Sequence, residues 1–310
     1  MKQIYKHKGF TLIELLVVMS IIALLLSILM PALGRAKAEA MLTKDQSQIK
    51  AIFSGFTFWT SSHNGRYPTP GLNARLGTES MGGDLIKGRG PEDLTQNDHA
   101  RLLSMCVMQN LFTTDLLYAP TEQGDNVFPM ESYDYNYYEP THDGQEWRLW
   151  DRDFGNDLTD EISSGDYSSA NNSYAIMPLT GKRKQQNWGV STHSPTSFAI
   201  IGTRGPEDGE PDEHSRSNLF HGIERDWKGA IFFGDGHGDV LETFYPSSST
   251  YRSTDVSLPD NLFKEDESQA ADADYMTGGL GQGHDVVLTH VIETKSGDGK
   301  GGECDAFYHD

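Results

Sequence analysis

The sequence predicts an α+β protein in which one long N-terminal helix, membrane-spanning in its first half, packs on a C-terminal antiparallel β-sheet domain. Three observations predict this fold. An apolar run covers residues 10–33, an amphipathic helical pattern follows it, and short β-rich segments bounded by turn residues come later. We therefore divide the chain into a basic segment 1–9, a helix 10–62 and a globular domain 63–310 that ends in an acidic tail.

Composition limits the partners of the chain. Its 310 residues include 25 Lys and Arg against 45 Asp and Glu, which gives a formal net charge of −20. We expect no binding to nucleic acid, because phosphate contacts depend on clustered Lys and Arg. The 14 Phe, 13 Tyr and 5 Trp predict a globular chain and not a disordered acidic one. Its 2 cysteines are too few for a disulfide framework.

Residues 10–33 are long enough to cross a bilayer, since a helix of this length spans about 36 Å. Three lysines precede the run and no acid does. Positive charge on a short N-terminal flank favours a cytoplasmic N-terminus. A conventional secretory signal has a shorter apolar core than this one. The segment is therefore predicted to remain as an anchor.

A single carboxylate, Glu14, lies near the start of the apolar run. A lone acid in an apolar helix costs about 3 kcal/mol, so such residues usually have a partner and a function. The surrounding sequence resembles the leader junction of type IV prepilins and type II secretion pseudopilins; it is Lys8-Gly9-Phe10-Thr11-Leu12-Ile13-Glu14-Leu15-Leu16. The alternative is a plain signal anchor with an accidental acid near its end.

The resemblance implies how this N-terminus is processed and used. A prepilin peptidase would cut after Gly9, so that residues 1–9 are the leader and Phe10 becomes the N-methylated first residue. Glu14 would meet the terminal amine of a neighbouring copy during filament assembly on an inner-membrane platform. The chain would cross the inner membrane once, with a periplasmic domain, and later join a periplasmic or cell-surface filament. Pro31 lacks an N–H and is expected to kink or locally unwind the helix.

The helix is expected to continue beyond the membrane. Apolar residues recur at spacings of three, four and seven, as in an amphipathic helix that packs on a sheet; they are Leu42, Ile49, Ile52, Phe53, Phe56 and Trp59. Polar residues lie between them in the sequence; they are Lys44, Asp45, Gln48 and Lys50. Gly55 is expected to be a weak point. A helix over 10–62 would span about 80 Å.

The end of the helix carries a second resemblance. Asn64-Gly65 and the prolines at 68 and 70 predict a turn and a loop. The same stretch resembles the Asn-Gly-x-Tyr-Pro-Thr segment that follows the long helix in type II secretion major pseudopilins. The two resemblances are separated along the chain as they are in that family.

The first part of the domain is expected to hold a variable loop over 71–97 and a short helix over 98–110. Ala119 occupies a position where related large pilin-like proteins often carry a Cys, so a disulfide of that kind is absent. Residues 133–167 are dense in Asp and Tyr. They predict either a half-buried strand pair with solvated acids or a carbohydrate- or cation-binding surface.

Four later segments are predicted to be strands: 173–177, 197–202, 229–234 and 285–292. The third runs into an Asp-Gly pair, which predicts a hairpin, and the fourth is placed at the sheet edge. Three stretches within residues 203–237 together resemble the C-terminal region of a group of large pilin-like proteins. That group is named for a His followed by nine residues and Asp-Gly. The stretches are Thr203-Arg204-Gly205-Pro206, His221 and Phe233-Gly234-Asp235-Gly236-His237. Here thirteen residues separate the His from the Asp, so the subfamily stays open.

Acidic loops offer candidate cation ligands. Asp235, His237 and Asp239 alternate, so an extended strand would place them on one side, but zinc would need further ligands that we cannot assign. Calcium is the better candidate, because it takes carboxylate and carbonyl oxygens and several pseudopilins that resemble this chain hold it in loops. The candidate ligands are Asp235, Asp239, Asp298 and Asp305. The alternative is a hairpin turn and a solvated acidic tail.

Three function classes follow from these observations. The first is a structural subunit of a type II secretion pseudopilus or a type IV pilus-like envelope filament. The second is a membrane-anchored surface module that binds carbohydrate or Ca²⁺. The third is an enzyme, such as a metal-dependent hydrolase using Asp235 and His237, but we expect no catalytic activity because common hydrolase and phosphate-loop motifs are absent. Cys106 and Cys304 could pair in an oxidising periplasm, if their distance allows it.

Overall fold

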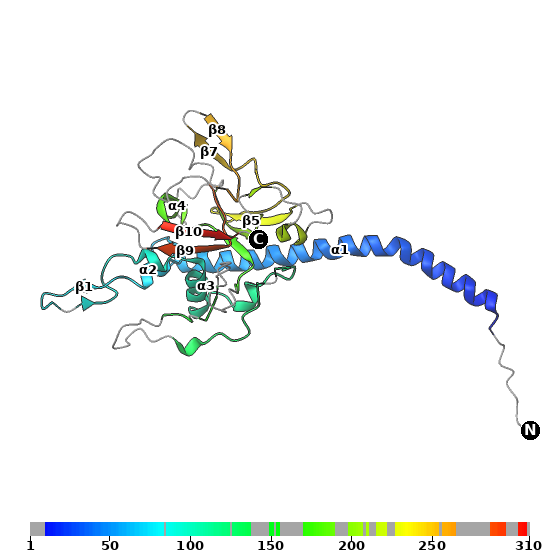
Figure 1. The fold of residues 1–310 in the computed structure, drawn as a ribbon, viewed down its shortest axis with the longest axis horizontal. Coiled ribbons are helices and arrows are strands. Elements are labelled where there is room, and N and C mark those ends of the chain that lie inside the picture. The colour runs from blue at the N-terminus through cyan, green and yellow to red at the C-terminus, as the bar shows by residue number, and fades with distance from the viewer. Residues whose placement is uncertain are drawn as a thin grey trace, which may run out of the picture.

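The predicted α+β architecture is confirmed by a computed structural model of the chain, in which a long helix is followed by a four-stranded antiparallel sheet. Helix α1 extends from Leu12 to Thr60. Figure 1 shows its C-terminal half running along the domain, whereas its N-terminal half extends away from it. The residues described are 10–83, 85–124, 126–137, 149–151, 153–155, 170–189, 198–206, 209–210, 215–221, 227–253, 256–264, 286–295 and 303–308.

Two weak points expected in α1 do not break it. The helix is continuous through Pro31, so the expected local unwinding is not found, although α1 bends along its N-terminal half (Figure 1). Gly55 is buried, and a Cβ at this position would lie 2.7 Å from Cδ1 of Phe112. Glycine at 55 therefore lets the Phe112 ring pack directly on the helix.

The buried face of α1 includes polar residues that the apolar pattern did not predict. Leu42 and Ile49 are buried as expected, but so are Asp45 and Gln48. The polar residues that lie between the apolar ones therefore do not all face solvent. Asp45 follows Leu42 by three residues and precedes Ile49 by four, and such spacings share one face of a helix.

An aromatic cluster joins the end of α1 to the domain. Its rings lie with centroids 5.3–6.3 Å apart and belong to Phe53, Phe56, Tyr67, Phe112, Trp188 and Phe232. Asn64 and Gly65 turn the chain with φ of 54° and 75°, a region that Asn and Gly adopt most easily. This turn brings Tyr67 under the sheet, where its hydroxyl donates to the Gly234 carbonyl at 3.3 Å.

The segment after α1 contains several short elements. The loop expected over 71–97 holds α2 (Pro70–Asn73), the hairpin of β1 (Thr78–Glu79) and β2 (Leu85–Ile86), and the 3₁₀ helix η1 (Leu94–Gln96). The predicted helix over 98–110 is confirmed as α3 (His99–Met108). Further 3₁₀ turns are η2 (Thr114–Leu116) and η3 (Tyr135–Tyr137). The strand pair predicted within 133–167 is not formed in the described residues of that range; the others lie outside the description.

The central sheet has the order β3-β4-β5-β6, with every pair antiparallel. Its strands are β3 (Tyr174–Ile176), β4 (Ala199–Thr203), β5 (Gly229–Phe233) and β6 (Gly238–Leu241). Three predicted strands and the Asp-Gly hairpin are thus confirmed. The first three strands are buried, and β4 and β5 pack against α1. Between them lie α4 (Gly181–Asn187) and η5 (Arg216–Leu219).

The fourth predicted strand, over 285–292, is only partly correct. Thr289 forms an antiparallel bridge with Ile176 of β3, so the segment does close that sheet edge. The residues just before Thr289 are buried without strand pairing. The regular strand is β9 (Val291–Lys295), which pairs with β10 (Glu303–Tyr308) instead. Another hairpin consists of β7 (Thr250–Ser253) and β8 (Val256–Pro259).

His99, at the start of α3, makes the stability of the fold depend on pH. Burial lowers the pKa of His99 to about 4, although the carbonyl oxygens of His290 and Met177, 3.3 Å and 3.4 Å from its ring nitrogens, oppose the shift. Between pH 6.5 and pH 4 the unfolded chain binds a proton at His99 that the folded chain does not. The free energy of unfolding therefore falls as the pH falls through this window.

We expect acidification from pH 7 to pH 4 to remove about 3 kcal/mol of stability through His99 alone. The measurement is urea unfolding of the full chain in detergent at several pH values, beside the variant His99→Gln. The amide of Gln can still donate to a carbonyl but does not titrate, so the variant should show a smaller loss. Parallel pH profiles for the two proteins would contradict the prediction.

Candidate functional site

The first candidate site is the start of α1. Gly9 and the residues before it lie outside the described part of the chain, so the Gly9–Phe10 junction stays a prediction. Phe10 precedes the helix and is 75% exposed. Residues 10–37 are all exposed in the single chain. In the described part of the chain, α1 is long and apolar enough to cross a membrane, and none of its most apolar window is buried.

Glu14 closes the N-terminus of α1 by a reciprocal cap. The Thr11 hydroxyl oxygen accepts from the Glu14 backbone N–H at 3.3 Å. In return, Glu14 Oε2 accepts from the Thr11 backbone N–H at 2.9 Å and from the Thr11 hydroxyl at 2.7 Å. This arrangement is a capping box, which satisfies donors that the first helical turn leaves open. In a single copy, the carboxylate is thus held at the helix end by its own chain.

Residues 4–30 match the family model described as the prokaryotic N-terminal methylation motif. The N-terminus is of the prepilin type. The match includes Gly9, Phe10 and Glu14, and it supports a type IV pilin-like filament subunit. A prepilin-type N-terminus implies processing by a prepilin peptidase, filament assembly and membrane association. The exposed apolar half of α1 fits a single-pass membrane anchor.

The match to the prepilin-type motif ends at residue 30 and does not extend to the globular domain. It does not distinguish a type II secretion pseudopilus from a type IV pilus. Neither the curated proteins nor the solved structures contain a match to this chain. The functional reading of the domain therefore depends on its own geometry.

A second candidate site is a buried polar cluster where α1 meets the sheet. Asp45 of α1 is fully buried. One of its carboxylate oxygens lies 2.7 Å from His221 Nε2 and accepts from the Thr121 hydroxyl at 3.2 Å. The other accepts from the Tyr174 hydroxyl at 3.2 Å. Burial, and then the charge of Asp45, raises the pKa of Tyr174, which keeps this hydroxyl protonated as a donor.

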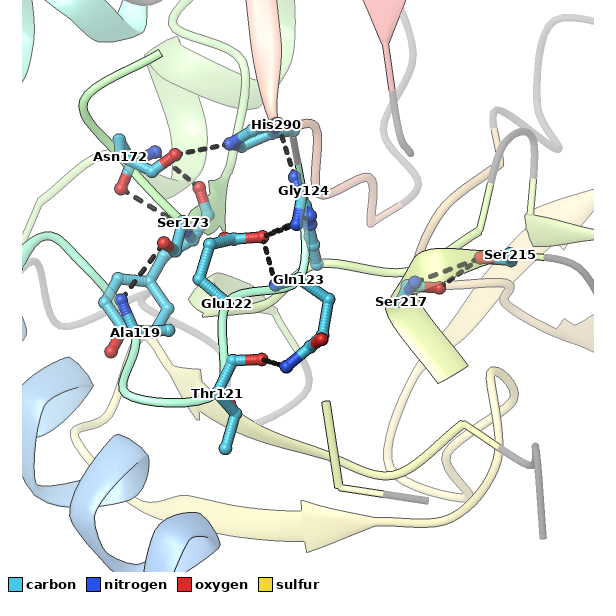
Figure 2. A network of polar contacts seen from close by, with 12 residues as sticks. Ala119, Thr121, Glu122, Gln123, Gly124, Asn172, Ser173, Ser215, Ser217 and His290 are labelled. Atoms are coloured by element: carbon cyan, nitrogen blue, oxygen red, sulfur yellow. Dashed lines mark hydrogen bonds and ion pairs between the residues drawn. The ribbon is translucent and has the colours of Figure 1, made fainter. Parts of the chain in front are cut away.

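Glu122 and Arg204 form a buried ion pair beside this cluster, with Arg204 Nη2 2.6 Å from Glu122 Oε1. Figure 2 shows the backbone amides of Gln123 and Gly124 directed at the same carboxylate, at 2.9 Å and 2.7 Å. The guanidinium of Arg204 also lies 4.9 Å from the centre of the Phe220 ring. A buried ion pair of this kind needs further hydrogen bonds, and the two backbone amides supply them to Glu122 Oε1.

The ion pair is connected to the last part of the chain through His290. Arg204 Nη1 lies 3.5 Å from His290 Nδ1, and His290 Nε2 lies 2.6 Å from the Asn172 carbonyl oxygen (Figure 2). Arg204 and His221 lie in the segments whose resemblance to large pilin-like proteins stays a prediction. In this fold their role is to hold the helix, the sheet and the C-terminal segment together.

Sequence reasoning missed Asp45 and Glu122, the acidic partners of these two residues. For Asp45 a signal was available, because its spacing to Leu42 and Ile49 places it on the apolar face of α1. An acid on that face requires a buried partner. For Glu122 the local sequence holds no comparable signal.

The residues predicted to bind calcium are only partly brought together. Asp235 Oδ1 accepts from the His237 backbone N–H at 3.1 Å and contacts His237 Nδ1, while Asp239 lies 3.8 Å from His237 Nε2. Asp298 and the side chain of Asp305 lie outside the description. Within the described residues, no group of three or more His, Cys, Asp or Glu is arranged to hold a metal ion.

Asp235 and His237 act locally as the turn of the β5–β6 hairpin. The His237 ring stacks on Phe233 with centroids 4.5 Å apart, and Gly236 supplies the positive φ of 92° that the turn requires. Partial burial raises the pKa of Asp235, but the hydrogen bonds and charge of His237 outweigh it and hold the pKa below its ordinary value. The hairpin turn is therefore sufficient to explain why Asp235 and His237 are in contact, without a metal ion.

The two cysteines can be placed only in part. Cys106 of α3 is a buried free thiol, and burial raises its pKa well above the ordinary value. Cys304 lies in β10, opposite Thr294 of β9, but its side chain is outside the description.

Proposed function

We propose that the chain is a structural subunit of a pilin-like envelope filament, either a type II secretion pseudopilus or a type IV pilus-like fibre. One observation carries the proposal: the prepilin-type motif is continuous with an apolar helical half that the domain leaves fully exposed. A helix that is apolar all round is stable only in lipid or between other helices. The membrane covers it before assembly, and other copies cover it in the filament.

The attachment of α1 to the domain supports this role. A filament built from helices must transmit force from the helical core to the domains around it. The aromatic cluster and the buried Asp45 contacts hold α1 firmly against the sheet. We place the N-terminus in the cytoplasm and the domain in the periplasm, following the lysines before Phe10. The assembly platform of the inner membrane is the proposed partner besides other copies of the chain.

Processing is the first test of this proposal. We expect the mature chain to begin at Phe10 with an N-methyl group, because Gly9 precedes the whole apolar helix and its removal leaves the anchor intact. Intact mass and N-terminal sequencing of the membrane-bound protein measure this directly. The variant Gly9→Val should retain the leader, whereas Gly34→Val, a glycine with open space around it, should be cleaved normally. A mature chain that starts after Ala38 would contradict the proposal.

The two other function classes have less support. A surface-binding role for a pilin-like stalk has no observation in its favour. A hydrolase would need Asp235 and His237 as catalytic groups, and these two residues already form the turn contact of the hairpin. We therefore propose a structural and not a catalytic protein.

Calcium binding through the acidic loops is kept as a second, smaller proposal. Asp235 and Asp239 both lie near the His237 ring, and their carboxylates are the kind of oxygen ligand that Ca²⁺ prefers. We expect added Ca²⁺ to raise the melting temperature of the detergent-solubilised chain. At a Ca²⁺ concentration of a hundred times the Kd, the free energy of unfolding should increase by about 2.7 kcal/mol. The variant Asp239→Asn should reduce this gain, and Mg²⁺ should not reproduce it. A melting temperature that is the same with Ca²⁺ and with chelator would contradict calcium binding.

A further inference from the structure

A lysine, a glutamate and an asparagine from different segments meet at the far end of the domain from the membrane helix's N-terminus. Lys184 lies in the last turn of α4, Glu92 precedes η1, and Asn97 follows η1. The Lys184 ammonium nitrogen contacts Glu92 Oε1, and Asn97 Nδ2 donates to the same oxygen at 2.8 Å. Asn97 is fully buried, and the Lys184 side chain is 13% exposed.

The side-chain oxygen of Asn97 also has a hydrogen-bond partner. Its Oδ1 accepts from the backbone N–H of Gly71 at 2.9 Å. A Cβ on residue 71 would lie 2.1 Å from the carbonyl oxygen of Asp93 and 2.9 Å from Asn97 Oδ1. Glycine at this position therefore allows the N–H to come close to the amide. A fixed backbone donor at a carbonyl oxygen stabilises the negative charge that develops there during attack by a nucleophile.

We propose that Lys184 and Asn97 join in an intramolecular amide bond, with Glu92 as the proton carrier. The unprotonated Lys184 Nζ attacks Cγ of Asn97, and the charge that develops on Oδ1 is held by the Gly71 N–H. Glu92 takes a proton from Nζ and gives it to Nδ2. The Cγ–Nδ2 bond then breaks, ammonia leaves, and the new bond joins Nζ to Cγ.

The surroundings favour this reaction over hydrolysis. Both nitrogens contact one oxygen, so Nζ lies within about 6 Å of Nδ2 before any side-chain movement. Holding the amine beside the amide in one chain favours the reaction over the same reaction between separate molecules. Burial lowers the pKa of Lys184 to about 7, with the charge of Arg66 adding to it, while the contact with Glu92 acts in the opposite direction. A lowered pKa increases the unprotonated fraction of the amine at pH 8, the pH of the test below. Because Asn97 is buried, water has little access to the amide.

The bond would connect the segment after α1 to α4, which lies between β3 and β4 in the chain. Such a link restricts the unfolded chain and resists separation of the two segments under tension. Its use against pulling forces rests on the proposed filament function. The bond itself does not, because it forms within one folded chain.

The test is peptide mapping by mass spectrometry of the full chain, purified in detergent and incubated at pH 8. We expect a linked peptide that contains Lys184 and Asn97 and is lighter than the sum of its two parts by one ammonia molecule. Absence of this peptide from the folded wild-type chain overturns the proposal. A link between Lys184 and Glu92 with loss of one water molecule overturns the assignment of Asn97 as the acyl donor.

Variants test the roles of Lys184 and Glu92. Lys184→Arg should abolish the linked peptide, and Glu92→Gln should slow its formation by about 100-fold or more, because the proton carrier is lost. Lys264→Arg is the matched control, since Lys264 forms a surface ion pair with Glu210 at 2.9 Å, and it should form the link at the wild-type rate. Formation at the wild-type rate in Glu92→Gln would overturn the role of Glu92. These mass readouts do not depend on filament assembly, so they can fail or succeed independently of the proposed function.

Discussion

Replacing Asp45 by alanine should lower the free energy of unfolding by about 3 kcal/mol or more, because each buried donor left without its acceptor costs about 1–3 kcal/mol. Asp45 is fully buried and its carboxylate meets His221, Thr121 and Tyr174. The variant leaves these polar groups in an apolar interior with one partner fewer, and each such loss is costly. The measurement is urea unfolding of the full chain in detergent at pH 7.

Glu39→Ala is the matched control for Asp45→Ala, because both residues are acids on α1. The Glu39 side chain is 69% exposed and lies 3.4 Å from Lys228, and exposed ion pairs contribute at most about 1 kcal/mol. The double variant Asp45→Ala with His221→Ala should lose less than the two single losses added together, since the pair interacts directly. Equal stability of Asp45→Ala and Glu39→Ala would show that the buried cluster does not hold the helix.

Replacing Glu14 by leucine should leave membrane insertion and cleavage intact and reduce filament formation by about 100-fold or abolish it. A carboxylate at membrane depth costs about 3 kcal/mol, and in the proposed filament the terminal amine of a neighbouring copy would offset this cost. A difference of 1.4 kcal/mol changes an equilibrium constant about tenfold, which sets the size of the effect. The measurement compares cleaved subunit in the membrane with subunit in sheared filaments.

The capping box offers controls for the Glu14 prediction. Thr11→Val removes the hydroxyl that pairs with Glu14 but keeps the carboxylate, so it should still assemble. Glu14→Gln keeps an oxygen that can accept from the Thr11 N–H but removes the charge, so it should fail to assemble. If Thr11→Val fails as completely as Glu14→Leu, the cap and not the charge is what assembly needs. Normal filaments from Glu14→Leu would contradict the pairing altogether.

The sequence was sufficient for every feature whose signal is local. The prepilin-type motif occupies neighbouring residues, and the match over residues 4–30 supports it. Helix α1 follows from residue spacing, since periodicity is set by backbone geometry within one element. Strands β3, β4 and β5 follow from short β-rich runs bounded by turn residues. The hairpin at Gly236 follows from turn chemistry, because an Asp-Gly pair tolerates the positive φ that the turn requires.

Only the tertiary structure decided how distant residues meet. The sequence pattern places Asp45 between apolar residues but does not show its partners, and the domain folds His221 and Tyr174 over it. Residues 286–288 are buried beside the sheet without pairing as a strand, because the backbone bridge to β3 is made by Thr289 alone. Periodicity reports which side of an element is apolar, and it does not report which groups cover that side.

The sequence by itself therefore determined the anchor, its processing motif and the class of the fold, because these depend on contiguous residues and on regular spacing. The tertiary structure decided the partners of the buried charges and the meeting of Lys184, Glu92 and Asn97. Their positions along the chain do not reveal this proximity, since it depends on where α4 and the segment before α3 pack. Contacts between residues far apart in sequence arise from the packing of whole elements, and that packing exists only in the folded chain.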